Sequence, residues 1–282
     1  MVLDLTKGIC ETEEYKAWKF PGGEIHFQFK FEVNEDITIK ANLKSSDDIM
    51  FLLLAVDTIK KDNNRVKIDL FIPYMAYQQA DINFGVGECF SLKTMCNLIN
   101  SMGLNKVSIF SPHSNVTSGL LDNCEVIDNS DFILKVLQFL HNDLGVIKEH
   151  MTDKIDDLII LSPDAGAFKL VFKLCKKLGF KGQIECCSKS RDDGEITSKV
   201  PIFNENKTVL IIDDIALGGR TFLAIKKQIK NKCYLAISHG VLNNGGYSDP
   251  VEDLLKEFEM IFTTDSRCNI ENERVKIFNL KL

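Results

Sequence analysis

Residues 208–221 read TVLIIDDIALGGRT, a strand-like run followed by a polar loop. The apolar, β-branched residues end in two adjacent carboxylates, Asp213 and Asp214, and a glycine-bearing loop leads into an amphipathic stretch. A strand that passes through a tight loop into a helix is typical of a parallel sheet, in which ligands bind beyond the carboxyl ends of the strands. Gly218 and Gly219 allow a close turn, and the amides at the helix start, with the Thr221 hydroxyl, predict a phosphate cradle.

The same strand, helix, strand pattern recurs on both sides of this segment. It occurs at 66–74, 91–104 and 106–112, again at 156–164, 167–180 and 183–189, and a third time where 219–231 and 233–240 follow the opening segment. We therefore predict an α/β fold with two domains, 1–140 and 141–282, each a mostly parallel sheet flanked by helices. Two alternating stretches within 19–43 predict an antiparallel β-hairpin in the first domain.

The amino-acid composition argues against several classes of binding partner. The 282 residues carry 34 Lys and Arg against 40 Asp and Glu, and a net charge of −6 argues against nucleic acid and anionic membranes as partners. Nine cysteines without a CxxC pair favour reduced thiols over zinc or disulfides. The charged first residues do not resemble a signal peptide, and no apolar run is long enough to span a membrane. We expect a cytoplasmic protein that binds small molecules.

Six segments, in order, resemble motifs of one enzyme family. They are FPGGEI at 20–25, IPYMAYQQAD at 72–81, the stretch 87–114 that ends in SPHS, SPDAG at 162–166, the opening segment 208–221, and SHGVL at 238–242. The opening segment resembles the phosphoribosyl pyrophosphate (PRPP) loop of type I phosphoribosyltransferases. The whole series resembles PRPP synthetases, or ribose-phosphate diphosphokinases, and among them a short viral subgroup that includes ADP-ribose pyrophosphate synthetases. Relative to the family, a final helix is expected to be missing.

The resemblance implies an activity and a set of residue roles. The implied reaction is the Mg²⁺-dependent transfer of the β,γ-diphosphate of ATP to the 1-hydroxyl of ribose 5-phosphate, in a homo-oligomer, dimer or hexamer, with ATP at a subunit interface. The implied catalytic residues are Lys189 and Arg191, in a loop that we expect to be mobile. Residues implied to bind ATP are Phe20, Glu24, Gln78, Gln79, Asp81 and His113. Residues implied to bind the sugar phosphate are Asp164, Asp213, Asp214, Gly218, Gly219, Arg220 and Thr221, with His113 and Asp164 at the metal.

Several positions depart from the family pattern and leave alternatives open. The nucleotide-contacting Arg and Gln of the family are replaced by Gln79 and Ala80, and a metal-side Asp is replaced by Ser111. Leu217 and Arg220 alter the acceptor loop, so ADP-ribose is an alternative acceptor. A further alternative is an inactive regulatory subunit that binds nucleotide or an active synthetase. A phosphoribosyltransferase that consumes PRPP is disfavoured by the long first domain and the Lys189 loop.

Overall fold

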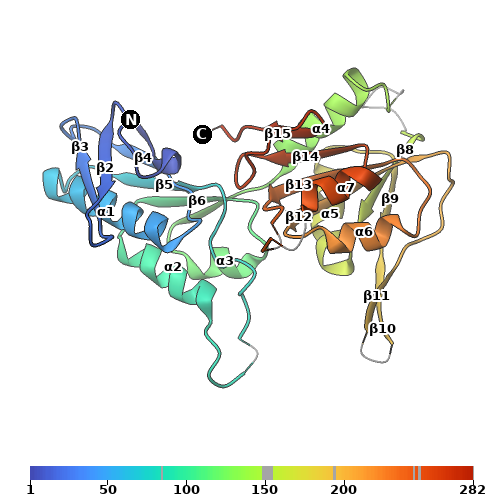
Figure 1. The fold of residues 1–282 in the computed structure, drawn as a ribbon, viewed down its shortest axis with the longest axis horizontal. Coiled ribbons are helices and arrows are strands. Elements are labelled where there is room, and N and C mark those ends of the chain that lie inside the picture. Colours follow the sequence, from blue (N-terminus) through green and yellow to red (C-terminus); the bar gives the residue numbers. More distant parts are fainter. Residues whose placement is uncertain (84, 148–154, 193–194, 244, 247–248, 282) are drawn as a thin grey trace. The chain divides into compact units, whose positions relative to one another are not determined.

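The structure is a computed structural model that describes residues 1–83, 85–147, 155–192, 195–243, 245–246 and 249–281, without the side chains of 189–192 and 195–198. The chain divides into two compact units, 1–128 and 129–281. Each unit has its own sheet (Figure 1) and its own hydrophobic core.

The first unit is built on a five-stranded parallel sheet with the order β1-β4-β5-β6-β7. The strands follow one another across the sheet without reversing direction. They are β1 (Val2–Asp4), β4 (Ile37–Lys40), β5 (Ile68–Ile72), β6 (Lys106–Phe110) and β7 (Cys124–Ile127). The helices of this unit are η1 (Leu5–Lys7), α1 (Ser46–Asp62), α2 (Ser91–Ser101) and α3 (Asn115–Leu120).

A two-stranded antiparallel hairpin of β2 (Tyr15–Lys19) and β3 (Ile25–Phe29) accompanies this sheet. The predicted hairpin thus exists, but its strands are not the two stretches within 19–43. The turn at 20–24 closes through Gly23, whose amide donates to the Phe20 carbonyl at 2.8 Å and whose φ of 98° suits glycine. The alternating stretch before this turn therefore pairs with β3, and β4 is free to lie between β1 and β5.

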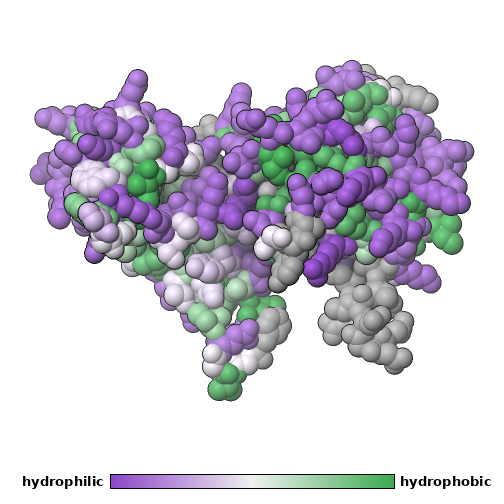
Figure 2. Space-filling view, in the orientation of Figure 1, coloured by the Kyte–Doolittle hydropathy of each residue, from purple (hydrophilic) through white to green (hydrophobic). Residues whose placement is uncertain are grey.

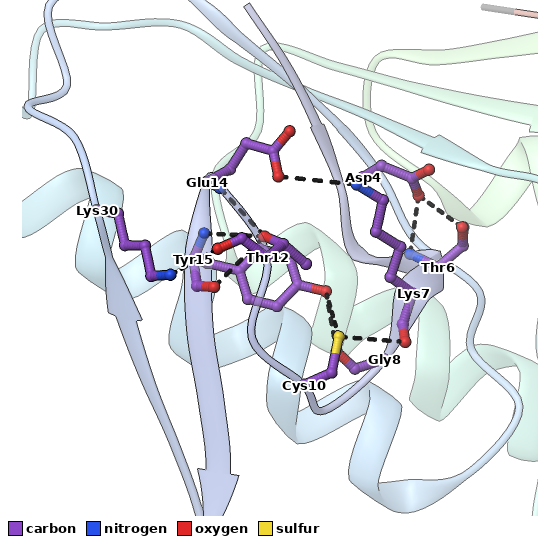
Figure 3. Close-up of polar contacts among 9 residues, drawn as sticks. All are labelled: Asp4, Thr6, Lys7, Gly8, Cys10, Thr12, Glu14, Tyr15 and Lys30. Carbon is purple, nitrogen blue, oxygen red and sulfur yellow. Dashed lines mark hydrogen bonds and ion pairs between the residues drawn. The ribbon is translucent and has the colours of Figure 1, made fainter.

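Polar contacts fix the chain that leads into the hairpin (Figure 3). The Asp4 carboxylate accepts from the Thr6 amide at 2.9 Å, and the Thr12 hydroxyl accepts from the Tyr15 amide at 3.1 Å. The Tyr15 hydroxyl donates to the Gly8 carbonyl at 2.9 Å. Burial raises the pKa of the Tyr15 phenol, so this donor keeps its proton at physiological pH. These hydrogen bonds therefore fix residues 4–15, from which the hairpin begins.

The second unit contains a six-stranded parallel sheet with the order β15-β14-β13-β12-β8-β9. From β8 the chain steps outward to β9 and then returns to form β12 on the other side of β8. The strands are β8 (Leu158–Ser162), β9 (Gln183–Cys186), β12 (Thr208–Ala216), β13 (Cys233–Gly240), β14 (Met260–Thr264) and β15 (Val275–Phe278). This reversal of strand order between β8 and β12 is where parallel sheets bind ligands at their carboxyl edge.

The helices of the second unit are α4 (Ser130–Asn142), α5 (Ala165–Lys177), α6 (Arg220–Lys226) and α7 (Pro250–Glu257), and β10 (Ser188–Asp192) pairs with β11 (Glu195–Lys199). The α/β class with parallel sheets and a first-domain hairpin is confirmed. Within the described ranges no helix is long and apolar enough to cross a membrane.

The division between the units lies after Asp128, earlier than the predicted boundary at residue 140. Helix α4 accounts for the difference, because its apolar face packs on the second sheet. The Phe132 and Phe278 ring centroids are 5.8 Å apart, and those of Phe139 and Phe262 are 5.7 Å apart. This packing places α4 with the unit that it covers.

The aromatic contact between α1 and the hairpin gives a stability prediction. Phe51 is fully buried, and its ring centroid lies 5.5 Å from those of Tyr15 and Phe27. Phe51→Ala should lower the free energy of unfolding of the first unit by about 3–5 kcal/mol, because the cavity cannot close against a sheet. Met50→Ala, at an exposed position beside it, is the matched control and should change this free energy by at most about 0.5 kcal/mol in urea titrations. Equal losses in the two variants would contradict the packing described.

Candidate functional site

The end of β12 is the centre of the candidate site. Residues Val209–Ile212 of this strand are buried, and β12 remains paired with β13 as far as Ala216 and Gly240. Its pairing with β8 ends earlier, at Ile211 and Leu161. Asp213 and Asp214 therefore follow the last pair with β8, at the strand reversal, and both are half-buried.

These carboxylates crowd one another. The pKa of Asp213 is raised well above its ordinary value, first by burial, then by the charge of Asp214 and its hydrogen bond, and further by the charge of Asp164. Asp164 follows β8 and caps α5, accepting from the Ala167 amide at 2.9 Å. Adjacent strand ends thus bring the charge of Asp164 close enough to act on Asp213. Such a group is relieved by hydroxyl donors or by a cation.

The loop after β12 presents backbone donors. Gly219 begins α6 with a φ of 73°, and no side chain among the described residues caps this helix. A Cβ on Gly219 would lie 2.9 Å from Leu254 Cδ1, so both the conformation and the packing require glycine. The Phe222 amide makes the first bond of the helix, to the Gly219 carbonyl at 3.0 Å, so the amides of Arg220 and Thr221 precede the helical bonds. The exposed Arg220 adds a positive charge beside them. This loop can bind an anion such as a phosphate.

In the first unit, β5 and β6 bring the predicted nucleotide residues to neighbouring strand ends. Gln78 is fully buried, and its side-chain oxygen accepts from the His113 amide at 2.9 Å. It therefore joins the segments that follow β5 and β6. Gln79 is exposed, whereas Asp81 and His113 are half-buried, so these three side chains reach solvent.

The hairpin turn carries the other predicted nucleotide residues, Phe20 and Glu24, and both are exposed. Phe20 lies in an aromatic group that the sequence reasoning missed. Its ring centroid is 6.0 Å from that of Trp18 and 5.6 Å from that of His26, which face each other across the hairpin register. The alternation of residues in β2 and β3 was the signal that could have revealed this group.

The predicted catalytic residues lie in β10. Lys189 pairs with Ser198 and Arg191 with Ile196 of β11, so this backbone is a two-stranded hairpin where a loop was expected. The two polar, alternating stretches around the glycine explain the strand pairing. The side chains of Lys189 and Arg191 lie outside the described residues.

The residues at the β12 end supply carboxylate oxygens, which are ligands for Mg²⁺. Within the described part of the chain, no three His, Cys, Asp or Glu side chains form a group that could hold a metal. His113 belongs to the first unit and Asp164 to the second. Magnesium ions commonly use one or two protein carboxylates, several waters and substrate phosphates. The crowded carboxylates fit an ion that arrives with a nucleotide, and they do not form a complete protein cage.

The chain is an α/β protein whose second parallel sheet combines a strand reversal, paired aspartates and an uncapped glycine loop. Residues 6–103 match the N-terminal domain of ribose phosphate pyrophosphokinase. The ribose-phosphate pyrophosphokinase of Mycoplasma genitalium is 26% identical over 98% of this chain and 83% of its own length. That of Sulfurisphaera tokodaii is 25% identical over 88% of this chain and 82% of its own length.

Phosphoribosylpyrophosphate synthetase from Mycobacterium smegmatis has the same fold, with a TM-score of 0.77, 18% identity, and coverage of 95% of this chain and 87% of that chain. The chain is therefore similar over most of its length to ribose-phosphate pyrophosphokinases, which are transferases. The predicted resemblance to PRPP synthetases is confirmed.

The crowding of Asp213 predicts a pH-dependent stability. Its pKa is higher in the folded protein than in the unfolded chain, so the folded state binds this proton more tightly. Stability is unaffected below the ordinary aspartate pKa of 3.8 and declines as pH rises from there through the folded pKa. Asp213→Asn should therefore raise the melting temperature at neutral pH, with little effect in acid.

Asp131→Asn is the control, because Asp131 is exposed and lies 2.9 Å from the Lys135 ammonium. Its melting temperature should not rise at neutral pH. A neutral-pH loss of stability in Asp213→Asn would show that the charge of Asp213 is stabilised in the folded protein.

Proposed function

We propose that this protein transfers the β,γ-diphosphate of ATP to the 1-hydroxyl of ribose 5-phosphate, giving PRPP and AMP. The observation that carries the proposal is the juxtaposition, at the β8 and β12 ends, of crowded carboxylates with an uncapped glycine loop. Its chemistry suits a sugar phosphate, and relatives named ribose-phosphate pyrophosphokinase align over nearly the whole chain.

The acceptor has two kinds of group to be bound. Its ribose hydroxyls are donors, and hydrogen bonds to Asp213 and Asp214 would offset the burial and the repulsion that together raise the pKa of Asp213. Its phosphate is an anion, for which the amides after Gly218, the Thr221 hydroxyl and the Arg220 guanidinium are suitable donors. Together these groups would fix the 1-hydroxyl relative to the sheet edge.

The donor side would use residues of the first unit. The exposed ring of Phe20 suits stacking against a nucleobase, and Glu24, Gln79, Asp81 and His113 supply polar groups for the nucleotide. Mg²⁺, when bound, neutralises charge on the phosphates. By resemblance we also propose a homo-oligomer.

The transfer forms a bond from the 1-hydroxyl oxygen to the β-phosphorus and breaks the bond from that phosphorus to the oxygen bridging to the α-phosphate. AMP leaves with that oxygen, and the hydroxyl proton is released. Charge spreads over the phosphoryl oxygens during this step, and nearby cations stabilise it. We assign this task to Lys189 and Arg191.

ADP-ribose is a second candidate acceptor, because two residues of the acceptor loop differ from the family pattern. Leu217 is 44% exposed and Arg220 is exposed, so both altered positions of the acceptor loop face solvent. A diphosphate-linked acceptor carries an additional phosphate and an adenosine, for which a further cation and an apolar side chain are suitable contacts.

Purified protein incubated with ATP and Mg²⁺ should release AMP when ribose 5-phosphate is added, and chromatography of the products checks this. AMP release with ADP-ribose alone would move the assignment to the second acceptor. No AMP with either would contradict both and favour a regulatory subunit, and consumption of PRPP with a nucleobase would favour a phosphoribosyltransferase.

Lys189→Ala should lower kcat by about 10²–10³-fold, because a cation that stabilises the transferred group acts mainly in the transition state. Lys199→Ala is the matched control, since Lys199 is an exposed lysine at the end of the same hairpin. It should leave kcat within about twofold of wild type. Equal kcat values in the Lys189 variant and wild type would remove Lys189 from the mechanism.

A further inference from the structure

The segment 238–242, SHGVL, has no role in the proposed chemistry, although it lies beside the acceptor loop. It begins at the end of β13, whose residues are all buried, and Ala216 of β12 pairs with Gly240. His239 is fully buried and contributes no group to the solvent-facing site. A buried imidazole at this position requires another explanation.

This segment binds the backbone at the start of the acceptor loop. The amides of Val241 and Leu242 both donate to the Ala216 carbonyl at 3.0 Å, and the Asn243 amide donates to the Leu217 carbonyl at 2.9 Å. These bonds hold the two residues that immediately precede Gly218. The path of residues 241–243 therefore sets where the phosphate-binding amides begin.

The path of the segment is itself constrained. The Gly240 amide donates to Thr263 Oγ1 at 3.0 Å, and a Cβ on Gly240 would lie 2.8 Å from that oxygen. Leu242 has a φ of 46°, in a region that residues other than glycine rarely adopt. Such a conformation persists only where surrounding contacts impose it.

A buried network around His239 supplies such contacts. His239 Nδ1 lies 2.8 Å from Ser266 Oγ, which in turn donates to the Ser238 carbonyl at 3.2 Å. Thr264 Oγ1 donates to the same carbonyl at 2.7 Å. If His239 Nδ1 carries the proton, it donates to Ser266 Oγ, and the Ser266 hydroxyl donates to the Ser238 carbonyl. The hydroxyl protons of Ser266 and Thr264 are then both used in hydrogen bonds to that carbonyl.

We propose that His239, acting through Ser266, is a positioning residue that sets the acceptor loop 216–220 for the phosphorylated sugar. The inference rests on the proposed function for its substrate. The hydrogen bond between the His239 imidazole and the Ser266 hydroxyl fixes the end of β13 against the residues that follow β14. The amides of residues 241–243 in turn bind the carbonyls of Ala216 and Leu217, so the position of β13 determines where the acceptor loop begins. Loss of the network should loosen the loop and leave the nucleotide residues of the first unit unaffected.

The first test is kinetic. His239→Ala and Ser266→Ala should raise the KM for ribose 5-phosphate about tenfold, the loss expected for one buried hydrogen bond, with the KM for ATP changed less than about twofold. His239→Asn should restore most of the acceptor affinity, because its side-chain nitrogen occupies the place of Nδ1. His239→Gln, whose nitrogen corresponds to Nε2, should not restore it.

His141→Ala is the matched control, since His141 Nδ1 lies 2.8 Å from the Ile147 carbonyl, a contact outside the acceptor loop. It should leave the KM for ribose 5-phosphate unchanged. An unchanged acceptor KM in the His239 and Ser266 variants, or an equal rise in the KM for ATP, would overturn the inference. If His239→Ala does not fold, Ser266→Ala and His239→Asn carry the test.

A second measurement does not depend on activity. Hydrogen exchange of the amides in 216–221 should be faster in Ser266→Ala than in wild type or His141→Ala, and slow again in His239→Asn. If wild type releases no AMP with ribose 5-phosphate or ADP-ribose, the proposed function fails, while the exchange pattern still decides whether His239 positions the loop. Equal exchange in Ser266→Ala and His141→Ala would refute that role.

Discussion

The burial and mutual repulsion of carboxylates at the end of β12 are the constraint on which the candidate site of the second unit depends. Asp213 and Asp214 are adjacent in the chain, and Asp164 comes to the same region because β8 and β12 are neighbours in a parallel sheet. Burying such a group destabilises the fold, and carboxylates with strongly shifted pKa values cluster at functional sites. The buried residues Val209–Ile212 anchor the strand firmly enough to hold these charges in place.

The sheet order explains why only one of the two units has this arrangement. In the first unit the strands β4 to β7 follow one another across the sheet, so no reversal opens between them. In the second unit the chain goes from β8 to β9 on one side and then returns to β12 on the other side of β8. The connections that follow β8 and β12 therefore lead away from each other. Ligands of parallel sheets bind at such a reversal, so topology and charge independently indicate the same candidate site.

The sequence predicted the fold class correctly because the fold follows from local patterns. Apolar runs, helix periodicity and the glycine loop lie within short windows, and Asp164, Asp213 and Asp214 follow directly from them. What could not be predicted depends on partners distant in the chain. The pairing of β2 with β3, the packing of α4 on the second sheet, and the contact of Gln78 with the His113 amide are of this kind.

Trp18 on the hairpin is the single tryptophan of the chain. It is half-buried, and its ring centroid lies 4.8 Å from that of His26 and 5.7 Å from the Lys16 ammonium. Intrinsic tryptophan emission therefore originates in the first unit alone, whereas circular dichroism averages over both sheets. Melting curves recorded by fluorescence and by circular dichroism need not coincide. A difference between their midpoints would show that the two units unfold in separate transitions.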